Sequence, residues 1–290
     1  MSADRIAAMP ALSALSLAVA SAFAWACFDL ARRYLAARVS AWTLVLGVTA
    51  GALPPLVAWG LVAGEWRIAT GYALPAAGSV VLNLGANFAY SRAFQLSPLS
   101  VTLPMLSLTP VFTALFGAAF LRESIPALGW AAILLVVAGA ALLGVSRDFR
   151  FEPGSALMLL VALLWSAALL LDKLALRAGS ANVHALVLNG GVAIGALGAL
   201  AATGRLADAR ALGRHLPLLA AAVLCGATAL TLQLLALAAV PVGLLETLKR
   251  GVGGTLAVVW GRAFFREPVT ARKVLAVVAL VAGVAVLLNR

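Results

Sequence analysis

The sequence predicts an all-α integral membrane protein of ten transmembrane helices, arranged as two inverted repeats of five helices each. Hydrophobic residues make up 64% of the 290 residues and charged residues only 11%, whereas soluble domains carry roughly 25% charged residues. Apolar runs of about 20 residues, the length that crosses a bilayer as a helix, recur along the whole chain. These runs are continuous rather than alternating, which excludes a β-barrel.

Ten apolar runs follow one another with short connections. Arg5 before the first run makes it similar to a secretory signal peptide, but a matching run in the second half makes it the first spanning helix. No connection is long enough to hold a soluble domain. We predict membrane helices over residues 11–30, 40–63, 72–94, 98–121, 126–145, 154–176, 183–203, 216–238, 241–263 and 271–288.

The chain repeats itself at an interval of about 140 residues, and such internal symmetry decides the fold of many proteins. The matching landmarks are Ala119–Glu123 with Ala263–Glu267, Val137–Gly139 with Val281–Gly283, and Trp25 and Arg33 with Trp165 and Lys173. We therefore divide the chain into a first five-helix repeat, residues 1–147, and a second, residues 148–290. Because each repeat has an odd number of crossings, the two insert with opposite topology, as in secondary transporters.

Charge and composition exclude several other classes of protein. The net charge is +11, but the basic residues are scattered singly, which favours contact with lipid headgroups over nucleic acid. Two cysteines lie in apolar runs, and two histidines, His184 and His215, lie in or near loops without ligand spacing, so we expect no disulfide framework, metal or cofactor. Protease, hydrolase and P-loop motifs are absent, so we expect no enzyme.

In this order, and present twice, the landmarks resemble the drug/metabolite transporter superfamily, specifically its ten-helix EamA-type permeases. Ala93–Pro98 leading to Thr109–Phe112 adds to the resemblance, which covers nearly the whole chain. It implies ten helices around a central cavity lined by the third, fourth, eighth and ninth, and export or exchange of small metabolites. It also implies cytoplasmic termini, although the distribution of Lys and Arg between the two sides favours the reverse orientation.

Three charged residues, Glu246, Lys249 and Arg250, interrupt the ninth apolar run. Their spacing of i, i+3 and i+4 places them on one helical face, and charges at this depth usually face a cavity and mark a substrate path. The three could instead only neutralise one another. The Lys-Arg pair resembles the phosphate-binding pair of the triose-phosphate translocator branch, but Leu106 stands where that branch has a second lysine.

Polar residues in other predicted helices are further candidates for substrate binding. Asn83, Asn87 and Tyr90 form a stripe on the third helix that either lines a cavity or holds helices together. Glycines in the seventh helix, Gly190, Gly191, Gly195 and Gly198, are interpreted as close-packing positions. The weaker candidates are Thr102 and Ser107 in the fourth helix, beside Pro104 and Pro110, and Thr228 and Thr231 in the eighth.

The function predicted from the sequence is secondary transport of a small anionic or zwitterionic metabolite, such as an amino acid or organic acid. The protein would act by alternating access as an exporter or exchanger. We expect a multi-pass protein of the cell (inner) membrane, a monomer or homodimer, whose partners are membrane lipids and a small-molecule substrate. The alternatives are an organophosphate/phosphate exchanger and a membrane scaffold that does not transport.

Overall fold

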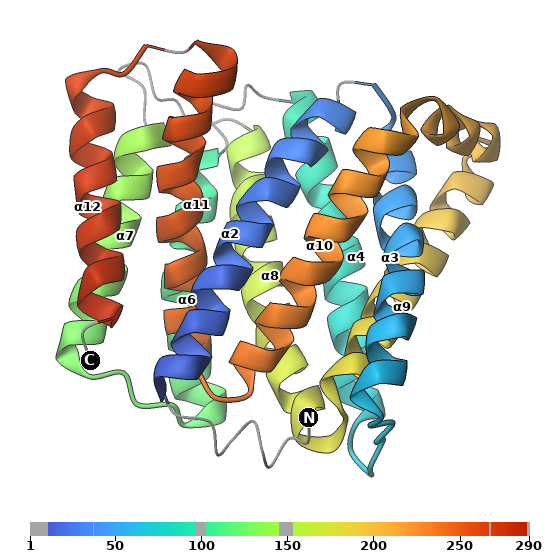
Figure 1. Ribbon diagram of the computed structural model, residues 1–290, viewed down its shortest axis with the longest axis horizontal. Helices are drawn as coiled ribbons and strands as arrows, with labels where there is room; N and C mark the ends of the chain where they lie inside the picture. Colours follow the sequence, from blue (N-terminus) through green and yellow to red (C-terminus); the bar gives the residue numbers. More distant parts are fainter. Residues whose placement is uncertain (1–10, 37, 97–102, 145–152, 267, 289–290) are drawn as a thin grey trace. The chain divides into compact units, whose positions relative to one another are not determined.

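The computed structural model describes residues 11–36, 38–96, 103–144, 153–266 and 268–288, which form ten α-helices and two 3₁₀ helices (Figure 1). No named strand occurs among these residues, only an isolated bridge between Ile68 and Gly179. The elements are α2 (Ala11–Ala36), α3 (Ala41–Ala63), α4 (Ala73–Leu96), η1 (Leu103–Leu108), α6 (Thr109–Leu121), α7 (Ala127–Gly144), α8 (Pro153–Ala178), α9 (Ala181–Ala202), η2 (Leu206–His215), α10 (Leu216–Leu237), α11 (Val242–Phe265) and α12 (Ala271–Leu288).

The all-α prediction is confirmed, and each of the ten apolar runs contains one α-helix of the described chain. Six helical segments are long and apolar enough to cross a membrane: residues 13–36, 41–63, 153–178, 181–202, 206–237 and 271–288. Two shorter apolar helices, residues 109–121 and 127–143, add to these. The remaining two, α4 and α11, carry the asparagine stripe and the charged triplet.

Two local features differ from the sequence prediction. The fourth predicted helix begins as a 3₁₀ turn, η1, and becomes α-helical only at Thr109. Pro110 lies in the first turn of α6, where a missing backbone N–H costs no helical hydrogen bond. The polar segment Leu206–His215 forms the 3₁₀ helix η2, although its composition predicted only a connection.

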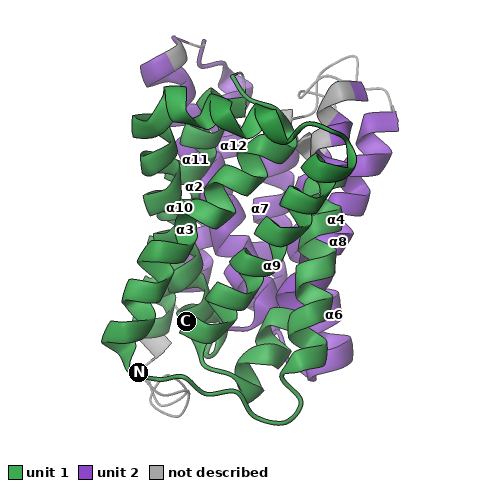
Figure 2. Cartoon of the chain, turned by 90° about the vertical axis from the view of Figure 1, so that its right-hand side faces the viewer, with its two compact units in different colours: residues 1–88, 171–239 green, residues 89–170, 240–290 purple. Residues whose placement is uncertain are grey.

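The chain forms two compact units, shown in separate colours in Figure 2. Unit 1 comprises Met1–Phe88 and Leu171–Ala239, and unit 2 comprises Ala89–Leu170 and Val240–Arg290. Each unit therefore takes helices from both halves of the sequence. The helices α4 and α8 each have one end in unit 1 and the other end in unit 2.

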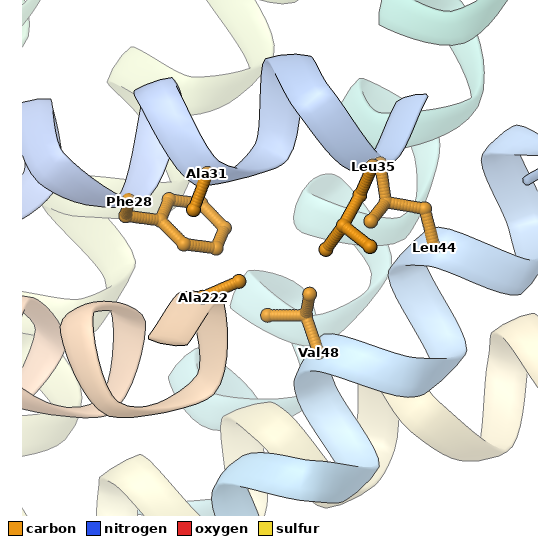
Figure 3. Close-up of a cluster of buried hydrophobic side chains, with 6 residues drawn as sticks. All are labelled: Phe28, Ala31, Leu35, Leu44, Val48 and Ala222. Carbon is orange, nitrogen blue, oxygen red and sulfur yellow. The ribbon is translucent and has the colours of Figure 1, made fainter. Parts of the chain in front are cut away.

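The core of unit 1 includes a hydrophobic cluster where α2, α3 and α10 meet. Figure 3 shows its side chains pointing toward one another from the three helices; they are Phe28, Ala31, Leu35, Leu44, Val48 and Ala222. Polar bonds add to this packing, since Trp25 Nε1 donates to Gln233 Oε1 at 2.8 Å and Ser21 Oγ donates to the Ala229 carbonyl at 2.8 Å. Apolar burial and buried hydrogen bonds thus both hold α2 to α10.

In unit 2, α7 and α12 pack through a reciprocal glycine contact. A Cβ added to Gly139 would lie 2.8 Å from the Ala276 carbonyl oxygen, and one added to Gly283 would lie 3.0 Å from the Ala132 carbonyl oxygen. Gly283 and Ala276 follow Gly139 and Ala132 at the same interval. Each glycine therefore lets one helix approach the backbone of the other at an equivalent place.

The ends of α6 and α11 also share one backbone geometry. Arg122 and Arg266, the C-cap residues, have φ of 56° and 54°. Their backbone N–H groups donate to the carbonyls of Gly117 and Gly261, respectively. Among the described residues other than glycine, these two alone have positive φ. The sequence repeat thus extends to an uncommon local conformation.

Candidate functional site

The charged triplet lies on α11, whose first residue is fixed by a side chain from the α6–α7 connection. Pro241, the N-cap, precedes the helix, and the Val242 backbone N–H donates to Glu123 Oε2 at 2.9 Å. A carboxylate at a helix N-terminus satisfies a donor that has no partner within the helix and complements the helix dipole. Arg250 lies eight residues beyond Val242, so its Cα is about 12 Å along the axis at a rise of 1.5 Å per residue.

One buried carboxylate contacts both cations of the triplet. Lys249 Nζ lies 2.7 Å from Glu246 Oε2, and Arg250 Nε lies 2.8 Å from Glu246 Oε1. The Glu246 side chain is 2% exposed, whereas those of Lys249 and Arg250 are 27% and 22% exposed. The triplet carries one negative and two positive charges, so it keeps one net positive charge while both cationic side chains retain some accessible surface.

Arg250 also reaches the start of α6. Its Nη2 donates to Thr109 Oγ1 at 3.4 Å, and the Thr109 hydroxyl donates to the Leu106 carbonyl at 2.6 Å. The Thr109 carbonyl accepts hydrogen bonds from Ser166 Oγ at 3.3 Å and Thr113 Oγ1 at 2.8 Å. Side-chain hydroxyl groups thus donate hydrogen bonds to backbone carbonyls at the junction of η1 and α6, where a membrane interior offers no water to do so.

The face of α11 that carries the triplet continues to Gly253, one turn beyond Lys249. A Cβ added at Gly253 would meet no heavy atom within 4 Å, whereas one added at Gly251 would clash with Val284 Cγ2. The two glycines therefore differ in role. Gly251 permits close packing, and Gly253 borders open space on the charged face.

The other predicted site residues are not all brought to this site. Ser107 is buried in η1 of unit 2, but its neighbour Thr109 is the residue that contacts Arg250. Tyr90, also in unit 2, packs on Trp165 with ring centroids 5.4 Å apart. Thr228 and Thr231 lie on α10 in unit 1, the former exposed and the latter half-buried. Thr102 lies outside the described residues.

The asparagine stripe lies in the unit 1 part of α4 and bonds along its own helix. Asn83 Nδ2 donates to the Ser79 carbonyl at 3.0 Å and to Ser79 Oγ at 3.2 Å. Asn87 Nδ2 donates to the Asn83 carbonyl at 2.8 Å. These are bonds to the preceding turn, and they leave the cavity role of the stripe a prediction.

A second charged cluster, which the sequence analysis missed, lies in unit 1. His184 Nε2 lies 3.0 Å from Asp172 Oδ1, Tyr72 Oη lies 3.2 Å from His184 Nδ1, and Ser79 Oγ donates to Asp172 Oδ1. His184 lies in the first turn of α9, close to the connection that precedes this helix, and is 0% exposed. The available signal was Asp172 itself, an acidic residue inside an apolar run.

The glycine prediction for the seventh helix holds at two of its four positions. A Cβ at Gly191 would lie 2.7 Å from Val80 Cγ1, and one at Gly195 would lie 2.5 Å from Leu84 Cδ2. Gly190 has its nearest neighbour at 4.0 Å and Gly198 has none within 4 Å. Only Gly191 and Gly195 therefore bring α9 close to α4.

Comparison with known proteins agrees with the helical architecture and the landmarks. Residues 12–145 match the model of the EamA-like transporter family. The matched stretch is somewhat less than half of the chain and is similar to this transporter family. The match agrees with the EamA-type resemblance over that stretch, and the long apolar helices are those of a multi-pass membrane protein.

The fold of nearly the whole chain is similar to that of a solved protein structure. A solved crystal structure superposes on it with a TM-score of 0.75 and 21% sequence identity, covering 95% of this chain and 96% of the other. It is one of 29 solved chains that match. At this level of identity the likeness shows the fold alone. Comparison with curated proteins gave no match.

Proposed function

We propose that this protein is a secondary transporter that exports or exchanges a small anionic or zwitterionic metabolite across the cell's inner membrane by alternating access. The observation that carries the proposal is the net positive triplet on α11. Its two cations share one buried carboxylate and still present part of their surface. A membrane helix that carries a costly cluster with a net positive formal charge has a reason to keep it if the cluster binds substrate.

The substrate class follows from the donors of Arg250. Its Nε is engaged by Glu246 and its Nη2 reaches Thr109 at the long distance of 3.4 Å. A guanidinium has five N–H donors, so donors remain for a carboxylate or phosphate oxygen. Lys249 adds a second cation on the same face. A carboxylate of an amino acid or organic acid fits the single net charge.

A phosphate ester is the second candidate, because the Lys-Arg pair resembles that of the triose-phosphate translocator branch. The residue in place of that branch's other lysine, Leu106, is buried and apolar. A dianionic group would therefore meet one positive charge fewer than in the branch. This favours a singly charged carboxylate over an organophosphate.

The antiparallel packing of α7 and α12 supports the inverted repeats that the proposal of alternating access includes. Along α7, Ala132 pairs with Gly283 and Gly139 pairs with Ala276, so residue numbers rise on one helix as they fall on the other. The two helices are therefore antiparallel while occupying equivalent positions of the repeat. A two-fold axis that relates two antiparallel helices runs perpendicular to them. Repeats of opposite topology in a membrane are related by an axis of the same direction.

The first experiment is a thermal-shift screen of the purified protein over amino acids, organic acids and sugar phosphates, followed by counterflow of the hits in liposomes. A ligand at 100 times its Kd stabilises the folded state by about 2.7 kcal/mol, which a melting curve resolves. Binding without flux would support the scaffold alternative. Preference for sugar phosphates over carboxylates would support the phosphate exchanger.

The second experiment tests the triplet. Arg250→Lys keeps the charge but loses the planar donor fork, so it should weaken the hit by about 1–3 kcal/mol, the scale of a charge-assisted hydrogen bond. Arg250→Ala should weaken it more. Arg262→Ala, an exposed arginine in the last turn of the same helix, is the matched control. A folded Arg250→Ala protein with unchanged binding and flux would refute the anion site.

A further inference from the structure

The polar cluster of unit 1 offers a site that the anion-binding role of α11 leaves unused. We propose that Asp172 and His184 form a proton-binding site, in which the pair holds one exchangeable proton between a carboxylate and an imidazole. The site stands on the geometry of unit 1 and does not depend on the proposed substrate. Its use in driving transport, by contrast, rests on the proposed function.

Burial makes the proton count of this pair matter. Asp172 is 3% exposed and His184 is 0% exposed. With one shared proton, as imidazolium and carboxylate or as imidazole and carboxylic acid, the pair is neutral overall. Without that proton it carries one negative charge in a site that excludes water, and such a buried charge is costly. Gain or loss of this proton therefore changes the net charge of the buried pair between zero and minus one.

The surrounding hydrogen bonds can hold both states without movement of heavy atoms. In the protonated state Nε2–H donates to Asp172 Oδ1 and Nδ1–H donates to the Tyr72 oxygen. In the deprotonated state Nε2–H still donates to Asp172, and Nδ1 accepts the Tyr72 hydroxyl proton. A phenol can accept or donate, so the 3.2 Å contact between Tyr72 and His184 serves either state. The hydroxyl of Ser79 keeps a donor on the carboxylate throughout.

One end of this cluster lies close to an exposed loop. Tyr72 directly precedes α4 and follows an exposed loop, residues 66–71, whose Ala69 N–H bonds the Ala178 carbonyl at 2.7 Å. Ser79 lies about 10 Å further along α4 at 1.5 Å per residue, and Asn83 continues the line by bonding Ser79. The proton would come from bulk water and return to it, so no bond other than N–H or O–H forms or breaks.

The other ionisable groups on the packed segments are few. The loop before α4 carries Glu65 and Arg67, and α8 carries Lys173 and Arg177 beside Asp172. The helix α3, which packs on α9, has no ionisable side chain, and α10 has only Cys225. The charged residues of η2 follow the far end of α9, about 27 Å from His184 along its axis. Among the described residues, the side chains of Tyr72 and Ser79 form hydrogen bonds with the pair.

The test exploits the fact that the chain has two histidines. In a His215→Gln background, ¹⁵N-histidine labelling in lipid nanodiscs reports His184 alone, and the ¹⁵N shifts distinguish imidazolium from each neutral tautomer. Between about pH 5 and pH 9, the range that brackets ordinary histidine titration, we expect the ring to pass from doubly to singly protonated. In Asp172→Asn, which removes the balancing charge, we expect it to stay neutral throughout.

A ring that keeps one protonation state in the parent protein over that range would overturn the proposal, and this measurement needs no variant at the site itself. An Asp172→Asn protein that titrates like the parent would also overturn it. If Asp172→Asn does not fold, a pH-indicator dye can count the protons taken up by folded His215→Gln and by His215→Gln/His184→Gln. We expect a difference of one proton per molecule, and equal counts would refute the site.

The transport arm separates failure of this site from failure of the proposed function. For any ligand found by the thermal-shift screen, His184→Gln should retain the ligand-induced shift but lose flux driven by a pH gradient. A screen of the parent protein that finds no anionic ligand would count against the anion site alone, since the NMR test of His184 needs no ligand. Retained gradient-driven flux in His184→Gln would refute proton coupling while leaving the anion site intact.

Discussion

Arg122 and Arg266 adopt the same left-handed backbone at the ends of α6 and α11, with φ of 56° and 54°. Each donates its N–H to a carbonyl five residues earlier, that of Gly117 or Gly261. Such a C-cap is usually a glycine, because other residues meet a steric clash there. The repeat therefore preserves a mildly unfavourable conformation in both halves.

Replacing either arginine with glycine should stabilise the protein. The left-handed conformation costs a non-glycine residue about 1–2 kcal/mol. Glycine avoids this cost, but its larger loss of backbone entropy on folding lowers the net gain by about 0.5–1 kcal/mol. We expect Arg122→Gly and Arg266→Gly each to raise the melting temperature measured by intrinsic fluorescence. Similar gains in the two variants would support equivalent cap geometry, and a loss in both would contradict it.

Adding a methyl group at the α7–α12 contact should destabilise unit 2. In Gly139→Ala or Gly283→Ala the new Cβ would lie within about 3 Å of a facing carbonyl oxygen, so the helices must separate, at a cost of about 1–3 kcal/mol. Gly198→Ala is the control, because its Cβ meets nothing within 4 Å. It should gain up to about 1 kcal/mol of helix propensity. Thermal melts that rank Gly198→Ala below the other two would contradict the packing.

Neutralising Glu246 should have opposite effects on stability and on anion affinity. Glu246→Gln leaves Lys249 and Arg250 without their shared carboxylate, and we expect a loss of about 1–3 kcal/mol in the free energy of unfolding. It also raises the net charge of the triplet by one, so an anionic ligand should give a larger thermal shift than in the parent protein. If both the stability and the ligand shift fall, the carboxylate positions the cations for binding rather than competing with the substrate.

The asparagines of α4 allow cavity and structural roles to be separated. Asn87→Leu should reduce flux with little change in melting temperature if the stripe lines the cavity, because a cavity polar group contributes little packing. Asn83→Leu should lower the melting temperature more, since it removes two bonds to Ser79, the residue that bonds Asp172. A destabilised Asn87→Leu protein with unaltered flux per folded molecule would assign the whole stripe to structure.

The sequence predicted the helices well because bilayer thickness imposes a length and composition that can be counted along the chain. It placed Glu246, Lys249 and Arg250 on one helical face because their spacing brings them together on any helix. It could not select Thr109 over Ser107, since the choice depends on where η1 ends and α6 begins. It also missed the pair of Asp172 and His184, whose partners lie on different helices and meet only through tertiary packing.

The reciprocal contact of Gly139 and Gly283 constrains how the two halves of the chain can change. In that contact each half meets the other with the same patch of surface, which is the isologous geometry of a two-fold dimer. A larger residue on either side of this patch therefore meets the backbone of the other half. Away from the patch the halves are free to differ, as the charged triplet of α11 illustrates.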